Sequence, residues 1–257
     1  QDGRLEIEKA KGRLQNLIAK TDNGASLPGT LGIGHTRWAT HGEPNDINSH
    51  PQVSQNGRIA VVHNGIIENY LEIREFLEEK GVVFTSQTDT EVVAQLMEYC
   101  MQLPEVQTVS DALYMVLHRI EGAYALGILS ADDPAHIYAA RKDAPLLLGF
   151  GAGENFIASD VTALVKYTRD IVYMDDGEVA VLGCDGIQVY NAMELPIEKE
   201  HHHIDWEISA AEKGGYEHFM LKEIMEEPEA LRRAILPRIK DGKVVFEGLQ
   251  LDIRQYH

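Results

Sequence analysis

The pattern of apolar and polar positions changes near residue 122. Before it, apolar residues recur at helical spacing and predict helices over residues 14–18, 71–80, 92–103 and 108–120. Shorter apolar runs predict strands at residues 5–7, 31–36, 58–63 and 82–84. After it, only short apolar runs occur, and they predict strands at residues 123–129, 136–140, 146–149, 155–158, 171–174, 178–182 and 187–190.

Tight turns separate the later strands. Asp176-Gly177 and Asp185-Gly186 are typical turn pairs, and each stands between two apolar runs. Strands joined so closely must be antiparallel, because a parallel crossover needs about a dozen residues or more. The sequence therefore predicts an α+β protein, with antiparallel strands in at least one large sheet and helices covering a face.

The last part of the chain has a different character. Residues 193–217 are polar and predict an irregular connector, and an amphipathic helix is expected to begin near Tyr216 and to break at Pro228. Residues 240–257 have no compact apolar set, which suggests a continuation into another domain. We expect one domain over residues 1–200 and a connector over residues 201–257.

The net charge of the chain argues against some classes of function. The 257 residues include 41 acidic and 23 basic ones, which gives a net charge of −18. Such a charge repels phosphate backbones and anionic membranes, and no apolar run reaches the roughly 20 residues that a bilayer requires. Two cysteines are too few for a disulfide scaffold. These observations predict a soluble, cytoplasmic protein that binds neither nucleic acid nor membrane.

The densest polar cluster lies in residues 34–44, where a predicted strand enters a loop rich in Gly and Pro. Arg37 offers a planar fork of donors that suits a carboxylate, and Thr40 and His41 add further donors. Binding sites commonly occupy such loops. The alternative is a loop held by one salt bridge, with Trp38 as a packing residue.

A second candidate is His63-Asn64-Gly65, at the end of a predicted strand. An Asn amide together with a backbone N–H is the usual composition of an oxyanion hole. The alternative is a plain Asn-Gly hairpin turn, which this dipeptide strongly favours. The apolar pair Ile66 and Ile67 that follows weakens the turn interpretation, because a simple return loop would face solvent.

Residues 88–91 have the S/T-x-x-E form of a capping box. Thr88 or Thr90 is expected to cap a helix, while Asp89 could anchor a ligand ammonium group. Cys100 and Cys184 have no neighbouring His or Lys in the sequence, so both are interpreted as core thiols. The run of histidines at residues 201–203 is interpreted as a solvated connector.

Four motifs in this order resemble the glutaminase domain of glutamine:fructose-6-phosphate aminotransferases, which are class II amidotransferases. They are GHTRWATHG at residues 34–42, HNGIIEN at 63–69, TDTE at 88–91 and GYEHFMLKEI at 215–224. The resemblance covers most of the chain. It implies the N-terminal-nucleophile hydrolase fold, a sandwich of two antiparallel sheets between helical layers.

The resemblance also implies residue roles. It assigns the binding of L-glutamine to six residues: Arg37, Trp38, Thr40, His41, Gly65 and Asp89. Arg37 would hold the α-carboxylate and Asp89 the α-ammonium group. Asn64 and Gly65 would form the oxyanion hole, as the catalytic residues of this chain. Trp38 would gate the passage of ammonia to a synthase half that converts fructose 6-phosphate to glucosamine 6-phosphate.

One departure from the family concerns the nucleophile, a cysteine at the mature N-terminus whose own α-amino group acts as base. This sequence begins with Gln1, so we expect that cysteine, the first strand and the first helix to be missing from it. The fragment alone would then turn over little glutamine. A glutamine-binding sensor and a purely structural partner domain are the alternatives. No metal or organic cofactor is implied, and the full-length enzyme is expected to be a homo-oligomer.

Overall fold

A computed structural model describes residues 4–37, 42–205, 216–240 and 243–245 of the chain. It divides into two compact units, residues 1–205 and 206–257, and each is described by itself. Among the described residues, no helix is both long enough and apolar enough to cross a membrane.

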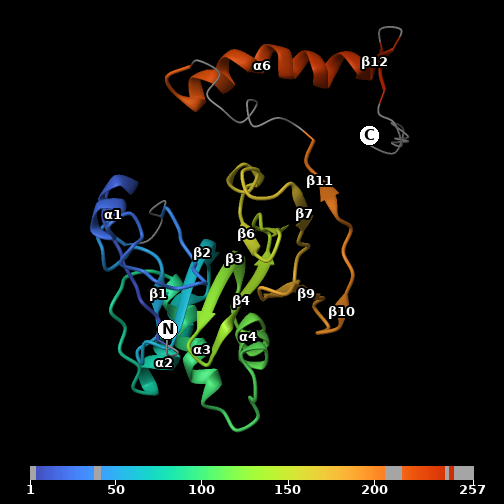
Figure 1. Ribbon diagram of the computed structural model, residues 1–257. Helices are drawn as coiled ribbons and strands as arrows, with labels where there is room; N and C mark the ends of the chain where they lie inside the picture. Colours follow the sequence, from blue (N-terminus) through green and yellow to red (C-terminus); the bar gives the residue numbers. More distant parts are fainter. Residues whose placement is uncertain (1–3, 38–41, 206–215, 241–242, 246–257) are drawn as a thin grey trace. The chain divides into compact units, whose positions relative to one another are not determined.

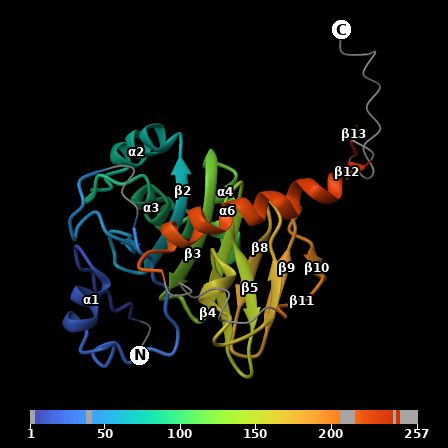
Figure 2. The ribbon, with the colours of Figure 1, turned by 90° about the horizontal axis from the view of Figure 1, so that it is seen from above.

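The first unit contains a seven-stranded sheet in which all neighbouring strands are antiparallel (Figure 1). Its strands, in spatial order, are β1 (Gln52–Val53), β2 (Ile59–Ile67), β3 (Gly122–Ser130), β4 (Asp133–Lys142), β8 (Val179–Leu182), β9 (Ile187–Tyr190) and β10 (Pro196–Ile197). Figure 2 shows β2 and β3 next to one another. This sheet and the helices below confirm the predicted α+β class.

A second, four-stranded antiparallel sheet packs against the first. Its order is β11 (His202–His203), β7 (Asp170–Tyr173), β5 (Leu147–Phe150) and β6 (Asn155–Ala158). One buried apolar cluster joins the sheets, with Leu148 and Val172 from the smaller sheet against Ala139 from the larger. The expected sandwich of two antiparallel sheets is therefore present.

Three helices cover the other face of the seven-stranded sheet (Figure 1). They are α2 (Tyr70–Glu79), α3 (Thr90–Met101) and α4 (Val109–Leu117). Side chains of strand β3 pack on both faces of the sheet. Leu126 and Ile128 pack in the helix-side cluster, while Ala125 packs between the sheets, since successive side chains in a strand point to opposite faces.

The remaining described elements are shorter or belong to the second unit. They are α1 (Leu14–Lys20), η1 (Val161–Ala163), α6 (Phe219–Ile235), η2 (Leu236–Arg238), β12 (Ile239–Lys240) and β13 (Lys243–Val244). The helix predicted over residues 14–18 is confirmed as α1, which ends at Lys20, and Gly24 in the turn that follows has φ of 88°.

Three predicted strands are wrong: residues 5–7, 31–36 and 82–84 form no strand in the described structure. Near residues 82–84, side-chain oxygens accept the backbone hydrogen bonds that a neighbouring strand would otherwise accept. The Val83 N–H donates to Oε1 of Gln55 at 2.7 Å, and the Thr85 N–H donates to Oε1 of Glu91 at 2.8 Å. A segment whose donors are satisfied in this way needs no ladder partner.

Two expectations for the C-terminal part are also corrected. Helix α6 continues through Pro228 instead of breaking there, because the carbonyl of Ile224 that loses its partner lies on an exposed turn, where water can replace it. The predicted irregular stretch contains β10 and β11, and the backbone of His203 pairs opposite Asp170 in β7. The proposed boundary at residue 200 stays a prediction.

Candidate functional site

A cavity of about 550 Å³ opens where several chain segments meet in the first unit. Its lining comes from the segment before residue 38, from the residues before β1, from the end of β2, from the start of α3 and from the residue after β6. The lining residues are Gly34, His35, Thr36, Arg37, His50, His63, Asn64, Gly65, Ile66, Asp89, Thr90 and Ser159. Four of the predicted site residues, Arg37, Asn64, Gly65 and Asp89, therefore lie around one cavity.

The Asn64-Gly65 pair lies within β2 and does not form a hairpin turn. The pairing with β3 runs without a break from Ile59 to Ile67, so the turn interpretation is wrong. Gly65 has φ of 136°, and a Cβ atom at this position would lie 2.1 Å from the carbonyl oxygen of Ala123. Only glycine fits this close approach of two backbones. The strand thus presents Asn64 and Gly65 as exposed residues at the cavity.

Asp89 precedes α3 but does not cap it. No side-chain hydrogen bond from Asp89 to the helix is present, and its Oδ2 instead accepts a hydrogen bond of 2.9 Å from the Ile67 N–H. The capping box predicted for residues 88–91 is therefore wrong. The reciprocal box occurs at α4, between Thr108 and Asp111. Asp89 is buried, so a carboxylate beside the cavity ties the start of α3 to the end of β2.

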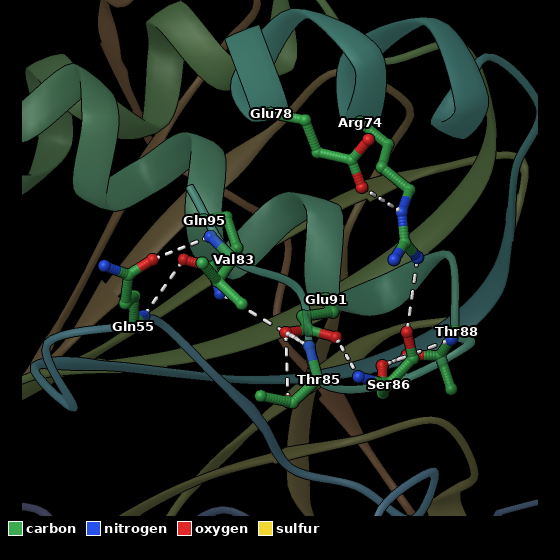
Figure 3. A network of polar contacts seen from close by, with 9 residues as sticks. All are labelled: Gln55, Arg74, Glu78, Val83, Thr85, Ser86, Thr88, Glu91 and Gln95. Carbon is green, nitrogen blue, oxygen red and sulfur yellow. Dashed lines mark hydrogen bonds and ion pairs between the residues drawn. The ribbon is translucent and has the colours of Figure 1, made fainter. Parts of the chain in front are cut away.

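The carboxylate of Glu91, which is completely buried, organises the loop before α3 (Figure 3). Oε1 accepts from the N–H of Thr85 at 2.8 Å and from its hydroxyl at 3.1 Å, and Oε2 accepts from the Ser86 N–H at 2.5 Å. Gln95 donates to Oε1 at 3.3 Å. Glu91 therefore points away from the helix start and holds the loop that leads to Asp89.

Arg37 contributes the positive charge at the cavity. Its Nη2 donates to the carbonyl of Gly42 at 3.4 Å. The guanidinium is also one cause that lowers the pKa values of the neighbouring His35 and His50. Three predicted substrate-binding residues, Trp38, Thr40 and His41, lie outside the described residues.

Three histidines form part of the cavity wall, and the sequence analysis did not assign them a role. The rings of His35 and His50 stack with centroids 4.4 Å apart. Burial is the main cause that lowers the pKa of all three, His35, His50 and His63, and burial together with the neighbouring groups lowers that of His50 to about 2. His50 stands alone in the sequence before a proline, so no local pattern marks it.

The other candidates from the sequence lie elsewhere. Cys100 is buried in α3 and burial raises its thiol pKa, as expected of a core thiol. Cys184 is exposed, so its interpretation as a core thiol is wrong, because it stands in the turn between β8 and β9. Nδ1 of His203 lies 2.7 Å from Asp170 on the surface. No group of His, Cys, Asp and Glu among the described residues is arranged to hold a metal ion.

Two facing antiparallel sheets with this cavity at their edge define the amidotransferase type of N-terminal-nucleophile hydrolase fold. Glutamine phosphoribosylpyrophosphate amidotransferase from B. subtilis, solved with ADP and GMP, matches with a TM-score of 0.52 and 26% identity over 62% of this chain and 34% of that chain. A structure described as the allosteric regulatory enzyme of purine biosynthesis matches with a TM-score of 0.51 and 27% identity, over the same shares.

The sequence comparison assigns the family. The glutamine amidotransferase domain family matches residues 35–166, more than half of the chain, and the chain belongs to this family. Similar proteins named glutamine–fructose-6-phosphate aminotransferase (isomerizing) occur in Caldanaerobacter subterraneus, with 51% identity over 97% of this chain, and in Pyrococcus horikoshii, with 48% over 96%. The chain spans 40% and 41% of those relatives.

Proposed function

We propose that this chain is a glutaminase domain, which binds L-glutamine and hydrolyses its side-chain amide to glutamate and ammonia. The observation that carries the proposal is the gathering of Arg37, Asn64, Gly65 and Asp89 around one cavity. These residues come from three separate segments of the chain, and the pattern of charges and donors matches an amino acid that carries an amide.

Each group of the cavity has a counterpart on glutamine. The Arg37 guanidinium suits the α-carboxylate, because a planar fork of donors can bind both of its oxygens. The Asp89 carboxylate suits the α-ammonium group. The Asn64 amide and the Gly65 N–H suit the oxygen that becomes negative when the amide is attacked. Trp38, Thr40 and His41 are proposed to complete the binding of glutamine.

The nucleophile is a separate question, since the chain's own cysteines are badly placed for it. Cys100 is buried in the core of α3 and Cys184 lies in a surface turn, and neither lines the cavity. We propose that the described residues carry the binding and the oxyanion parts of the reaction. The family resemblance supports an N-terminal cysteine as the attacking thiolate, with its α-amino group as base.

The named relatives support a finer proposal for the whole protein. They are called glutamine–fructose-6-phosphate aminotransferases, and this chain covers about two fifths of their length. We propose that ammonia released here passes, through a gate at Trp38, to a synthase half that makes glucosamine 6-phosphate from fructose 6-phosphate. A homo-oligomeric enzyme in the cytoplasm is part of the same proposal.

Calorimetric titration of the chain with L-glutamine tests the binding part, with D-glutamine as the control ligand. We expect L-glutamine to bind and D-glutamine to bind much more weakly, because inversion at Cα separates the charged groups from Arg37 and Asp89. Ammonia release by the natural full-length protein tests the reaction. Binding without ammonia release in that protein would favour a glutamine sensor, and no binding at all would favour a structural domain.

A further inference from the structure

Strand β1 begins at Gln52, and the side chain of His50, just before it, continues the pairing with β2. Gln52 lies opposite Val61 and Val53 opposite Ala60, so the same register places position 50 opposite His63. Pro51 has no N–H and cannot extend the ladder. Nδ1 of His50 accepts the His63 backbone N–H at 3.1 Å instead. An imidazole thus replaces a strand carbonyl immediately before Asn64.

This bond determines which ring nitrogen of neutral His50 carries the hydrogen. Nδ1 of His50 accepts a hydrogen from a backbone N–H, so the neutral ring must carry its own hydrogen on Nε2. That nitrogen lies 3.4 Å from the Thr90 hydroxyl. A hydroxyl that accepts there can donate its own hydrogen to Nδ1 of His63, at 3.1 Å. In that direction of the ring, His63 is also protonated on Nε2.

The three hydrogen bonds form a closed ring. It runs from the backbone of His63 to His50, from His50 to Thr90, and from Thr90 back to the side chain of His63. Oδ2 of Asp89 lies 3.8 Å from Nδ1 of His63. It is occupied by the Ile67 N–H, and in this arrangement both Oδ2 and Nδ1 are acceptors. The ring is therefore complete without an ion pair to Asp89.

Burial favours the neutral histidines that the ring requires. Thr90 is 1% exposed and His63 is 3% exposed. Burial lowers the pKa values of both histidines, although the Asp89 carboxylate opposes the effect at His63. The other groups that bear on His50 are His35, Arg37 and Lys9, and each of them further disfavours its protonated form.

We propose that His50 and Thr90 are positioning residues, which hold the Asn64 end of β2 in a fixed relation to the Asp89 end of α3 through this ring. The inference rests on the proposed function for its ligand, because glutamine presents its amide and its ammonium group at a limited separation. Neither Asn64 nor Asp89 belongs to the ring. Each is the chain neighbour of a ring member, Asn64 of His63 and Asp89 of Thr90.

Nitrogen NMR of the uniformly nitrogen-labelled chain tests the ring without any ligand. We expect His50 and His63 to be protonated at Nε2 and unprotonated at Nδ1. In Thr90→Val, which loses the hydroxyl and keeps the shape, the His63 ring resonances should change. The Asn64 side-chain amide and the Ile67 N–H, which reports on Asp89, should move as well. Thr90→Ser should return them to their wild-type positions.

Two results of these NMR measurements would contradict the inference. A hydrogen on Nδ1 of His63 would reverse the Thr90–His63 hydrogen bond and contradict the inference. Unchanged Asn64 and Ile67 resonances in Thr90→Val would show that the ring does not position them. Both results are independent of glutamine, so they separate a failure of this inference from a failure of the proposed function.

Measurements of the affinity for L-glutamine test whether the ring affects binding at the cavity. We expect Thr90→Val to bind about tenfold more weakly, the order of one lost hydrogen bond, and Thr90→Ser to bind like the wild type. Thr168→Val is the matched control, because it also removes a buried hydroxyl, which bonds to Phe150, but lies outside the cavity lining. Unchanged affinity in Thr90→Val would contradict the positioning role, whereas a wild-type chain that binds no glutamine would contradict the proposed function.

Discussion

Gly65 in β2 and Ala123 in β3 approach so closely that a Cβ atom at position 65 would lie 2.1 Å from the Ala123 carbonyl oxygen. The contact is with backbone, which cannot rotate away as a flexible side chain could. The approach occurs at the proposed oxyanion hole, where β2 leaves the buried part of the sheet and meets the cavity. The residue type at position 65 is therefore dictated by the neighbouring strand.

The Gly65→Ala substitution should destabilise the chain by about 2–4 kcal/mol, since it adds strain at positive φ to a backbone clash. We also expect the binding of L-glutamine to be lost, because the end of β2 must move. Urea unfolding and calorimetry measure the two effects. Gly186→Ala is the control. A Cβ atom there meets nothing within 4 Å, so a change within about 0.5 kcal/mol is expected. Equal stability of the two variants would contradict the clash.

The Arg37→Ala substitution should weaken L-glutamine binding by about 10- to 100-fold, the cost of losing a charged hydrogen-bonding partner at the cavity. Arg37→Lys should recover only part of the affinity, because an ammonium group cannot bind both carboxylate oxygens in one plane. Arg58→Ala controls for the loss of one positive charge, since Arg58 pairs with Asp132 away from the cavity. If both alanine variants bound glutamine equally well, Arg37 would have no special role.

Stability should fall as the pH is lowered below about 6.5, the ordinary pKa of histidine. The folded-state pKa of His50 is lowered to about 2, so the unfolded chain binds more protons over this range. The contribution is complete above pH 6.5 and is lost toward pH 2, at about 1.4 kcal/mol per pH unit for one site. His35 and His63, which adjoin His50, shift in the same direction and should steepen the fall.

The variant His50→Asn isolates the part that His50 contributes. Its amide oxygen can accept the His63 N–H in place of Nδ1, and it does not titrate. Urea unfolding at pH 7, 6 and 5 should show a slope smaller by up to about one proton. An unchanged slope would mean that His50 is not the group responsible.

The Glu91→Gln substitution should cost about 1–3 kcal/mol, because an amide keeps only one acceptor oxygen and would place its donor hydrogens against the N–H group of either Thr85 or Ser86. We also expect weaker binding of L-glutamine, as the loop before Asp89 loses its anchor. Glu78→Gln is the control, since it removes only a partly exposed ion pair to Arg74, worth less than about 1 kcal/mol. Thermal unfolding of both variants, followed by calorimetry, makes the comparison. Equal effects of the two changes would contradict a special role for Glu91.

The sequence by itself predicted the helices and strands whose apolar patterns lie within a short stretch of chain. Apolar spacing predicted α2 and α4, and short apolar runs between turn residues predicted the strands from β3 to β9. The motifs at residues 34–42, 63–69 and 88–91 predicted the family, which the comparison confirmed. These features could be predicted because helix periodicity, strand alternation and motif order can all be recognised from residues close together in the chain.

Only the tertiary structure determined which strand pairing and which hydrogen-bond partners those stretches have. The Asn64-Gly65 pair, with a strong turn signal, lies in a strand because β3 pairs along its whole length. The capping-box pattern at residues 88–91 forms no cap because Asp89 bonds to Ile67 and Glu91 to the preceding loop. His50 acquires its place through His63 and Thr90, which lie 13 and 40 residues away. A side chain bonds to the donor that folding brings near it, and local sequence does not specify that donor.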